Sequence, residues 1–326
     1  MKRVALRPLA VSLVLLAAAP SVHAQTASGP FRPVTDTVTA KIMRRIAALS
    51  ADSMEGRRAG SPGSVRARAW IIGELSAMGA QPAVGGSFEM PIKLRPRAGS
   101  TDTVGANIVA RIPGKKPGAP VLVVSAHYDH LGVRNGETFN GADDDASGCI
   151  ALLTLGERLL KDKPEHDVIL AFFDAEEGGL QGSKAFVANP PIDLAAVALD
   201  ISLDMIARQD GEALWVSGTS HYPALKPIAD AVAKNAAVPI KFGHDTKDLK
   251  PGDDWTNSSD HGSFHAKGIP FLYLGVEDHP DYHKPGDDAD KIDPQFYRGT
   301  VEFAIALARR ADKSLPEIFK TRKPAP

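Results

Sequence analysis

The most restrictive feature of this sequence is a repeated order in which a short apolar segment is followed by a polar loop and then by a segment with helical periodicity. The apolar segments have the length of buried strands and lie at 121–126, 168–173, 197–203 and 269–274. Helical periodicity is present at 146–161, 181–188, 223–236 and 295–311. Strands that are apolar at consecutive positions are covered on both faces, so this order predicts an α/β domain whose sheet has helices on both sides.

The part of the chain before these segments is predicted to add two amphipathic helices and one strand. Ile42, Ile46 and Leu49 recur at helical spacing, and a second helical pattern ends at Met78. Segment 105–112 has the alternation of apolar residues that is typical of a strand.

The composition limits the class of function. The chain has 326 residues, 43% of them hydrophobic, and can therefore bury a full core. A formal net charge of -1 gives no broad basic surface for nucleic acid or for an anionic membrane, so binding must come from a local site. Cys149 is the only cysteine, which excludes a disulfide within the chain, and its apolar surroundings favour a small buried core residue over a catalytic thiol.

The first 24 residues are typical of a secretory signal peptide. A basic start and a short apolar stretch lead to Ala24, before Gln25. The stretch is too short to span a bilayer comfortably, so we expect cleavage near Ala24/Gln25, no membrane anchor afterwards, and a secreted or periplasmic protein. The expected organisation is a signal peptide at 1–24, a flexible lead-in at 25–37, a single domain at 38–315 and a C-terminal tail at 316–326.

Polar residues gather where the predicted strands end. The clusters lie at 125–130, 141–148, 174–183, 202–206 and 281–285. Each cluster alone is ambiguous, because acidic residues before a helix are often N-caps and paired glutamates are usually solvated. The carboxyl ends of strands in α/β sheets meet in one crevice, so the clusters together predict one site rich in carboxylates and imidazoles.

A metal cation is the simplest explanation for such a site. Burying several carboxylates beside an apolar sheet is costly unless a cation compensates their charge. Imidazole and carboxylate ligands without thiolate suit zinc in a hydrolytic site, and two zinc ions can share one carboxylate and activate a water between them. Glu176 and Glu177 would then divide the work, one as a metal ligand and the other as the group that accepts the proton of the water.

The order of the motifs resembles that of the co-catalytic dizinc aminopeptidases, a family that includes secreted bacterial leucyl aminopeptidases and, more distantly, glutamate carboxypeptidase and glutaminyl cyclase. The matching motifs are His-x-Asp at 127–129, Gly-Ala-x-Asp-x-Ala-Ser-Gly at 141–148, Glu-Glu-x-Gly-Leu-x-Gly-Ser at 176–183, Leu-Asp-Met-Ile at 203–206, Ser-Asp-His-x-x-Phe at 259–264 and Tyr-His at 282–283. The resemblance, which runs from about residue 40 to 311, implies a three-layer sandwich of the zinc exopeptidase type with a central mixed, mostly parallel sheet. It also implies a secreted metallo-aminopeptidase that hydrolyses the N-terminal bond of peptides with a free N-terminus.

The resemblance implies two zinc ions and five ligands. His127, Asp144 and Asp204 would hold the first ion, and Glu177 and His283 would complete the second. Asp144 would be the carboxylate that bridges the two ions.

Further roles follow from the same motifs. Glu176 falls at the position of the general acid and base, and Tyr282 at the position that stabilises the oxyanion. Asp129 would orient the histidine that binds the first zinc. Asp260 and His261 would support the wall of the pocket.

Two departures from the family pattern affect these assignments. The family usually has Asn where this chain has Asp145, so the bridging role is open among Asp143, Asp144 and Asp145, and the register favours Asp144. Arg208 follows the Leu-Asp-Met-Ile motif and could be a surface residue or a charge on the substrate side, with the surface position favoured. Only residues 79–120 separate the second predicted helix from the strand before His127, so no protease-associated insert is expected.

Three other functions remain open on this scaffold. A glutaminyl cyclase uses one working zinc, against which the pair of His127 and His283 argues. A carboxypeptidase or dipeptidase needs a basic pocket, for which Arg208 and Lys284 are weak candidates. A non-catalytic binding module would have eroded motifs, whereas these are intact. The shared ligands specify neither the preferred side chain of the substrate nor the oligomeric state.

Overall fold

The computed structural model describes residue 1 and residues 36–95, 104–118, 120–246, 248–250 and 252–322. Apart from Met1, the predicted signal peptide lies outside these residues, as do nearly all of the lead-in and the last residues of the C-terminal tail. None of the helices in the described part of the chain is long and apolar enough to cross a membrane.

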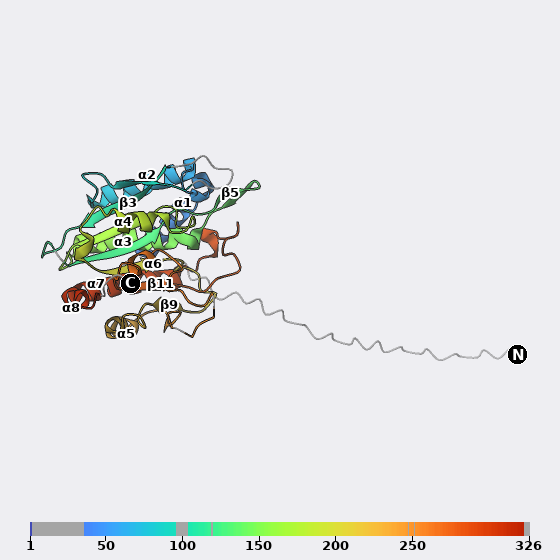
Figure 1. Ribbon diagram of the computed structural model, residues 1–326. Helices are drawn as coiled ribbons and strands as arrows, with labels where there is room; N and C mark the ends of the chain where they lie inside the picture. The colour runs from blue at the N-terminus through green and yellow to red at the C-terminus, as the bar shows by residue number, and fades with distance from the viewer. Residues whose placement is uncertain (2–35, 96–103, 119, 247, 251, 323–326) are drawn as a thin grey trace. The chain divides into compact units, whose positions relative to one another are not determined.

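A mixed sheet of nine strands forms the middle layer of the domain (Figure 1). Its strands are β1 (Gln81–Pro82), β2 (Glu89–Lys93), β3 (Val104–Ile112), β4 (Val121–His127), β7 (Val168–Phe173), β8 (Val197–Leu203), β9 (Leu214–Ser217), β10 (Ile240–Phe242) and β11 (Phe271–Gly275). The order across the sheet is β1-β3-β7-β4-β8-β11-β9-β10, with β2 also paired to β3. The central strands β7, β4, β8 and β11 are parallel, whereas β3 and β9 join them in antiparallel pairs.

Eight α-helices accompany the sheet in the described ranges. They are α1 (Thr37–Leu49), α2 (Pro62–Met78), α3 (Gly148–Lys161), α4 (Gln181–Ala188), α5 (Lys226–Ala233), α6 (His261–His265), α7 (Pro294–Lys313) and α8 (Leu315–Phe319). A hairpin of β5 (Gly132–Arg134) and β6 (Glu137–Phe139) forms a separate small sheet. Since both faces of the main sheet are covered, the predicted three-layer α/β sandwich is confirmed.

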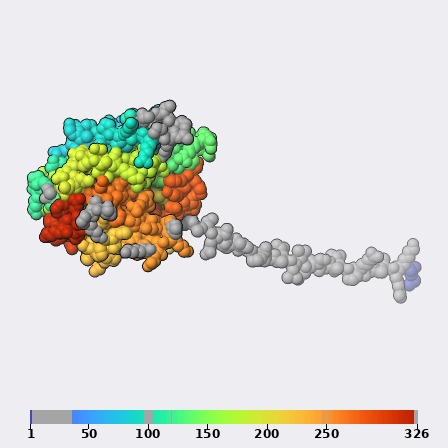
Figure 2. Space-filling model, viewed as in Figure 1, coloured from blue at the N-terminus to red at the C-terminus, as the bar shows by residue number. Residues whose placement is uncertain are grey.

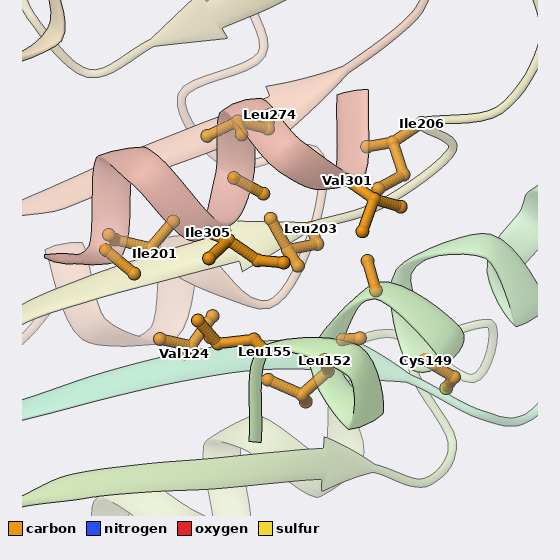
Figure 3. Close-up of a cluster of buried hydrophobic side chains, with 14 of the residues drawn as sticks. Val124, Cys149, Leu152, Leu155, Ile201, Leu203, Ile206, Leu274, Val301 and Ile305 are labelled. Atoms are coloured by element: carbon orange, nitrogen blue, oxygen red, sulfur yellow. The ribbon is translucent and has the colours of Figure 1, made fainter. Parts of the chain in front are cut away.

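The larger core lies between the sheet and a layer that contains α1, α2, α3 and α7. Figure 3 shows Leu152 and Leu155 of α3 and Ile305 of α7 packed beside Ile201 and Leu203 of β8. These side chains are almost fully buried, and each contributes roughly 1.5–3 kcal/mol of transfer free energy. This packing fixes the position of α3, and the predicted metal-binding loop directly precedes the N-terminus of this helix.

The smaller core covers the opposite face of the sheet. Val123 and Ile169 point to this side, where they meet Phe186 of α4 and Phe264 of α6. Helices α4 and α6 lie next to each other, and in Figure 2 the yellow-green and orange surfaces of these regions are adjacent. Alternate residues of β4 and β7 therefore serve different cores, which is the period of two expected of a strand covered on both faces.

The helices begin and end at capping residues. Asp36 accepts hydrogen bonds from the first amides of α1, and Ser61 and Asp293 do the same before Pro62 and Pro294 at the starts of α2 and α7. Two predicted helices are shorter than expected. The helix predicted at 223–236 is regular only over 226–233, and the one predicted at 146–161 begins at 148, after a separate turn at 142–147 in which Asp144 and Asp145 have non-helical angles.

Candidate metal centre

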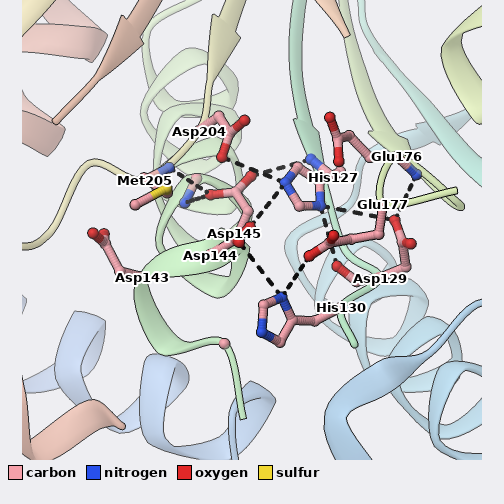
Figure 4. Close-up of polar contacts among 12 residues, drawn as sticks. His127, Asp129, His130, Asp143, Asp144, Asp145, Glu176, Glu177, Asp204 and Met205 are labelled. Atoms are coloured by element: carbon pink, nitrogen blue, oxygen red, sulfur yellow. Dashed lines mark hydrogen bonds and ion pairs between the residues drawn. The ribbon is translucent and has the colours of Figure 1, made fainter. Parts of the chain in front are cut away.

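The strand ends bring the predicted ligands together at one edge of the sheet (Figure 4). His127 is the last residue of β4, Asp204 directly follows β8, and Glu177 follows β7. Asp144 comes from the turn that precedes α3, and His283 from the loop after β11. Because β7, β4, β8 and β11 are parallel neighbours, residues far apart in the sequence meet at their carboxyl ends.

The five residues form two groups that share Asp144. The Nε2 atom of His127 lies 3.2 Å from Asp144 Oδ1 and 3.4 Å from Asp204 Oδ1. The Nε2 atom of His283 lies 3.2 Å from Asp144 Oδ2 and 3.3 Å from Glu177 Oε1. Tetrahedral ligands at zinc bond lengths lie about 3.3 Å apart, so both groups have the spacing of ligands around one ion.

Asp144 is the member of the acidic triplet that faces both groups. Asp143 instead accepts a hydrogen bond from the amide of Ala207, at 2.7 Å. Asp145 accepts hydrogen bonds from the amides of His127 and Gly148, at 3.1 and 2.8 Å. The carboxylate of Asp145 therefore accepts hydrogen bonds from backbone amides, and the Asp144 carboxylate is the one that lies near both histidines.

The loop that carries Asp144 is fixed by buried polar groups. The Asp287 carboxylate accepts hydrogen bonds from the amides of Asp143 and Asp144. The fully buried Arg57 guanidinium donates to carbonyl oxygens that include those of Tyr128 and Gly141, at 2.8 Å each. The sequence did not identify either role, because each depends on contacts between distant segments.

The charges and the unsatisfied atoms of the site fit a bound cation. Burial alone would lower the pKa of His127, but nearby carboxylates, above all Asp204, raise it well above its usual range. Burial likewise opposes protonation of His283, yet hydrogen bonds to Asp144 and Glu177 raise its pKa to about 10. Asp204 Oδ1 and Glu177 Oε1 are buried without a hydrogen-bond partner, which is costly for a carboxylate. Both the donor types and these unsatisfied atoms fit divalent zinc.

The other predicted residues surround the two groups. Asp129 accepts a hydrogen bond from the amide of Glu176 at 2.8 Å, and its Oδ1 lies 3.7 Å from His127 Nδ1. The Tyr282 ring stacks on His283 with ring centres 4.0 Å apart. Burial raises the pKa of the Glu176 carboxyl well above its usual range.

Asp260 and His261 lie behind the pocket, at the start of α6. Both are almost completely buried. The His261 Nε2 atom is 2.7 Å from the Trp255 carbonyl oxygen, and its ring centre is 4.6 Å from that of Tyr273. Burial lowers the pKa of His261 to about 3 and raises that of Asp260 to about 7.

A small cavity of about 210 Å³ opens onto the two groups. Its lining consists of His127, Asp144, Glu176, Glu177, Asp204, Met205, Gly252, Trp255, Ser258, Tyr273, Val276, Asp278, Tyr282 and His283. Among the residues that the structure describes there, none is a lysine or an arginine. Trp255, Ser258 and Asp278 were not foreseen, because they reach the cavity from loops without a motif.

Arg208 is neither of the two things that the sequence suggested. The favoured interpretation, a surface arginine, is wrong because only 7% of its side chain is exposed. Its guanidinium lies 2.9 Å from Asp210 and 3.0 Å from Asp281, which precedes Tyr282 and His283 in the chain. Arg208 does not line the cavity either. Through its pair with Asp281 it links the loop after Asp204 to the loop that carries His283.

Comparison with known proteins identifies the family. The sequence pattern of peptidase family M28 matches residues 107–308, which is more than half of the chain. The chain belongs to peptidase family M28. This membership agrees with the predicted peptidase class.

Three similar proteins illustrate the range of this family and fold. The vacuolar membrane protease of Kluyveromyces lactis is 31% identical over 96 residues, which cover 29% of this chain but only 10% of that protein. The Legionella pneumophila LapA aminopeptidase superposes with a TM-score of 0.64 at 20% identity, over 85% of this chain and 72% of LapA. A Bacteroides thetaiotaomicron glutaminyl cyclase bound to N-acetylhistamine superposes with a TM-score of 0.65 at 18% identity, over 83% of this chain and 97% of the cyclase. At these identities the two structures support the fold and not a shared activity.

Proposed function

We propose that this M28 peptidase is a secreted metallo-aminopeptidase that removes single residues from peptides with a free N-terminus. The observation that carries the proposal is the charge of the cavity. Asp144, Glu176, Glu177, Asp204 and Asp278 line it without a basic side chain among the described residues. Asp144, Glu177 and Asp204 would be neutralised by the metal ions, whereas Glu176 and Asp278 would still attract the ammonium group of a peptide N-terminus, and no lysine or arginine of the described lining would hold a C-terminal carboxylate.

The basic residues near the site are occupied elsewhere. Arg208 is paired with Asp210 and Asp281, as described above. The Lys284 Nζ atom lies 2.5 Å from the carbonyl oxygen of Pro280. Neither lines the cavity, which disfavours a carboxypeptidase or dipeptidase.

We assign the metal ligands from the two groups. His127, Asp144 and Asp204 would hold one zinc ion, and Asp144, Glu177 and His283 the other. When bound, the ions would supply Lewis acidity, which polarises the scissile carbonyl and lowers the pKa of water. Asp129 would fix the ring of His127 through contacts with its Nδ1.

The chain's own residues would then move the proton and stabilise charge. Glu176 is a cavity residue beside the ligands, and its raised pKa suits a carboxylate that accepts a proton from water and passes it to the leaving amine. Tyr282 lines the same cavity, and its hydroxyl would donate to the developing oxyanion. Asp260 and His261 would support the wall from behind.

The similar proteins allow one rival that must be tested. LapA is an aminopeptidase, whereas a protein of equal structural similarity is a glutaminyl cyclase. Two complete ligand groups, rather than one, favour the peptidase here. Export rests on the signal-like sequence at 1–24 alone.

Product analysis by mass spectrometry distinguishes these activities. Zinc-loaded protein would be incubated with matched peptides whose N-terminus is free, acetylated or glutamine. We expect loss of single N-terminal residues from free peptides and no change in acetylated ones. Loss of ammonia from the glutamine peptide, or trimming from the C-terminus, would contradict the proposal.

A further inference from the structure

One buried histidine beside the metal centre is unexplained by the five-ligand assignment. His130 follows the motif that contains His127 and is fully buried. Its Nδ1 atom lies 2.9 Å from Glu177 Oε1 and 3.6 Å from Asp144 Oδ2 (Figure 4). These are the two oxygens that His283 also contacts, at 3.3 and 3.2 Å.

In the described part of the chain, Glu177 and Asp144 are the only charged groups recorded against the His130 ring. Neither of its nitrogens makes a hydrogen bond with acceptable geometry, even though Nδ1 is close to Glu177. Buried polar side chains are nearly always satisfied, so an unpartnered imidazole that faces two carboxylates indicates a missing partner. A cation between the three groups would satisfy all of them.

The position of the ring is built into the fold. Gly141 lies against it, and a Cβ atom at this glycine would come within 2.6 Å of the ring carbons Cγ and Cδ2. Gly141 also has a φ of 56°, which favours glycine. The backbone at the start of the acidic triplet therefore leaves room for an imidazole at this place.

We propose that His130 is a further ligand of the ion held by Asp144, Glu177 and His283. This inference rests on the metal centre proposed above. It makes the two sites unequal, because this ion would have four protein ligands, whereas the ion at His127, Asp144 and Asp204 would have three. A site with four protein ligands is closed, and a site with three keeps a position open. The four-ligand site should therefore retain its metal more tightly, and the three-ligand site should lose it first.

The stepwise zinc affinities of His130→Ala test the proposal. Competition with a chromophoric chelator would give both dissociation constants, and His166→Ala would serve as the control, since His166 is also buried but pairs with Asp312 away from the site. We expect one zinc affinity of His130→Ala to fall about 100-fold, by analogy with losses near metal sites, and free imidazole to restore it. The control should keep both affinities.

The possible outcomes separate this inference from the proposed function. Two unchanged affinities in His130→Ala would overturn the role of His130 while leaving the metal centre intact. A wild-type protein that binds fewer than two zinc ions would instead overturn the metal centre itself. If His130→Ala does not fold, X-ray absorption at the zinc edge of the loaded wild type decides: three imidazoles for two zinc ions support the proposal, and two contradict it.

Discussion

Substitution of Glu176 by glutamine separates metal binding from proton transfer. Glutamine has the same size and can still occupy the cavity, but it cannot accept a proton at neutral pH. The backbone N–H of residue 176 donates a hydrogen bond to Asp129 Oδ1 at 2.8 Å, and a change of side chain leaves this bond in place. We therefore expect Glu176→Gln to bind zinc as the wild type does and to lose most of its turnover.

The size of the loss follows from the neighbours of Glu176. Positioned general acid and base catalysis contributes about 10²–10⁴ in rate, or about 3–5 kcal/mol. Glu177 could be a substitute only if it were free, but its Oε1 lies 2.9 Å from His130 and 3.3 Å from His283. Because two imidazoles hold Glu177 in place, it cannot replace Glu176, and we expect kcat to fall toward the upper end, about 10³-fold or more.

The assay measures kcat for an N-terminal leucine anilide together with zinc content by elemental mass spectrometry. Glu165→Gln is the matched control, since it makes the same chemical change at a surface residue beside Lys115. It should leave both values unchanged. A Glu176→Gln protein with full zinc and kcat within tenfold of the wild type would refute the role of Glu176, and loss of zinc would show that this residue holds metal instead.

Three further substitutions test other parts of the account. Arg208→Met removes the tie to Asp281, so the loop of His283 should loosen, and zinc affinity should fall about 10- to 100-fold in a chelator competition; unchanged affinity would contradict this positioning role. Trp255→Ala opens the apolar wall of the cavity, so kcat/KM should fall about 10- to 100-fold for leucine or phenylalanine substrates and less for alanine ones; equal losses would argue against a side-chain pocket there. Burial raises the pKa of Asp200 well above its usual range. The folded protein therefore keeps a proton on this carboxyl that the unfolded chain releases above a pH of about 4. The free energy of unfolding should fall as the pH rises from there toward the folded pKa. Asp200→Asn should flatten this decline in calorimetric Tm between about pH 5 and 8, and an unchanged slope would show that another group causes it.

Much of the fold was predictable from local patterns. The strands at 121–126 and 168–173 are apolar at every or nearly every position, because both faces are buried, and β4 and β7 lie there. The short strands β9 and β10 were not predicted, because three or four residues at a sheet margin carry little periodicity. Their place is set by pairing with β11 and with each other.

The predicted ligands could be brought together because strand ends in a parallel sheet converge. The motifs placed His127, Asp144 and Asp204 at such ends, and the structure brings the Nε2 atom of His127 within 3.4 Å of a carboxylate oxygen of each aspartate. His130 lay in the predicted cluster at 125–130 without an assigned role, and Trp255 was not predicted to belong to the site. A buried histidine without a partner and a tryptophan in a loop acquire meaning only from distances across the fold, which the sequence does not contain.

Anomalous diffraction from zinc-loaded crystals tests the central claim most directly. We predict two peaks about 3.5 to 4 Å apart on either side of Asp144, one near His127 and Asp204 and the other near Glu177 and His283. A single peak, or peaks that do not share Asp144, would contradict a two-zinc mechanism for this peptidase.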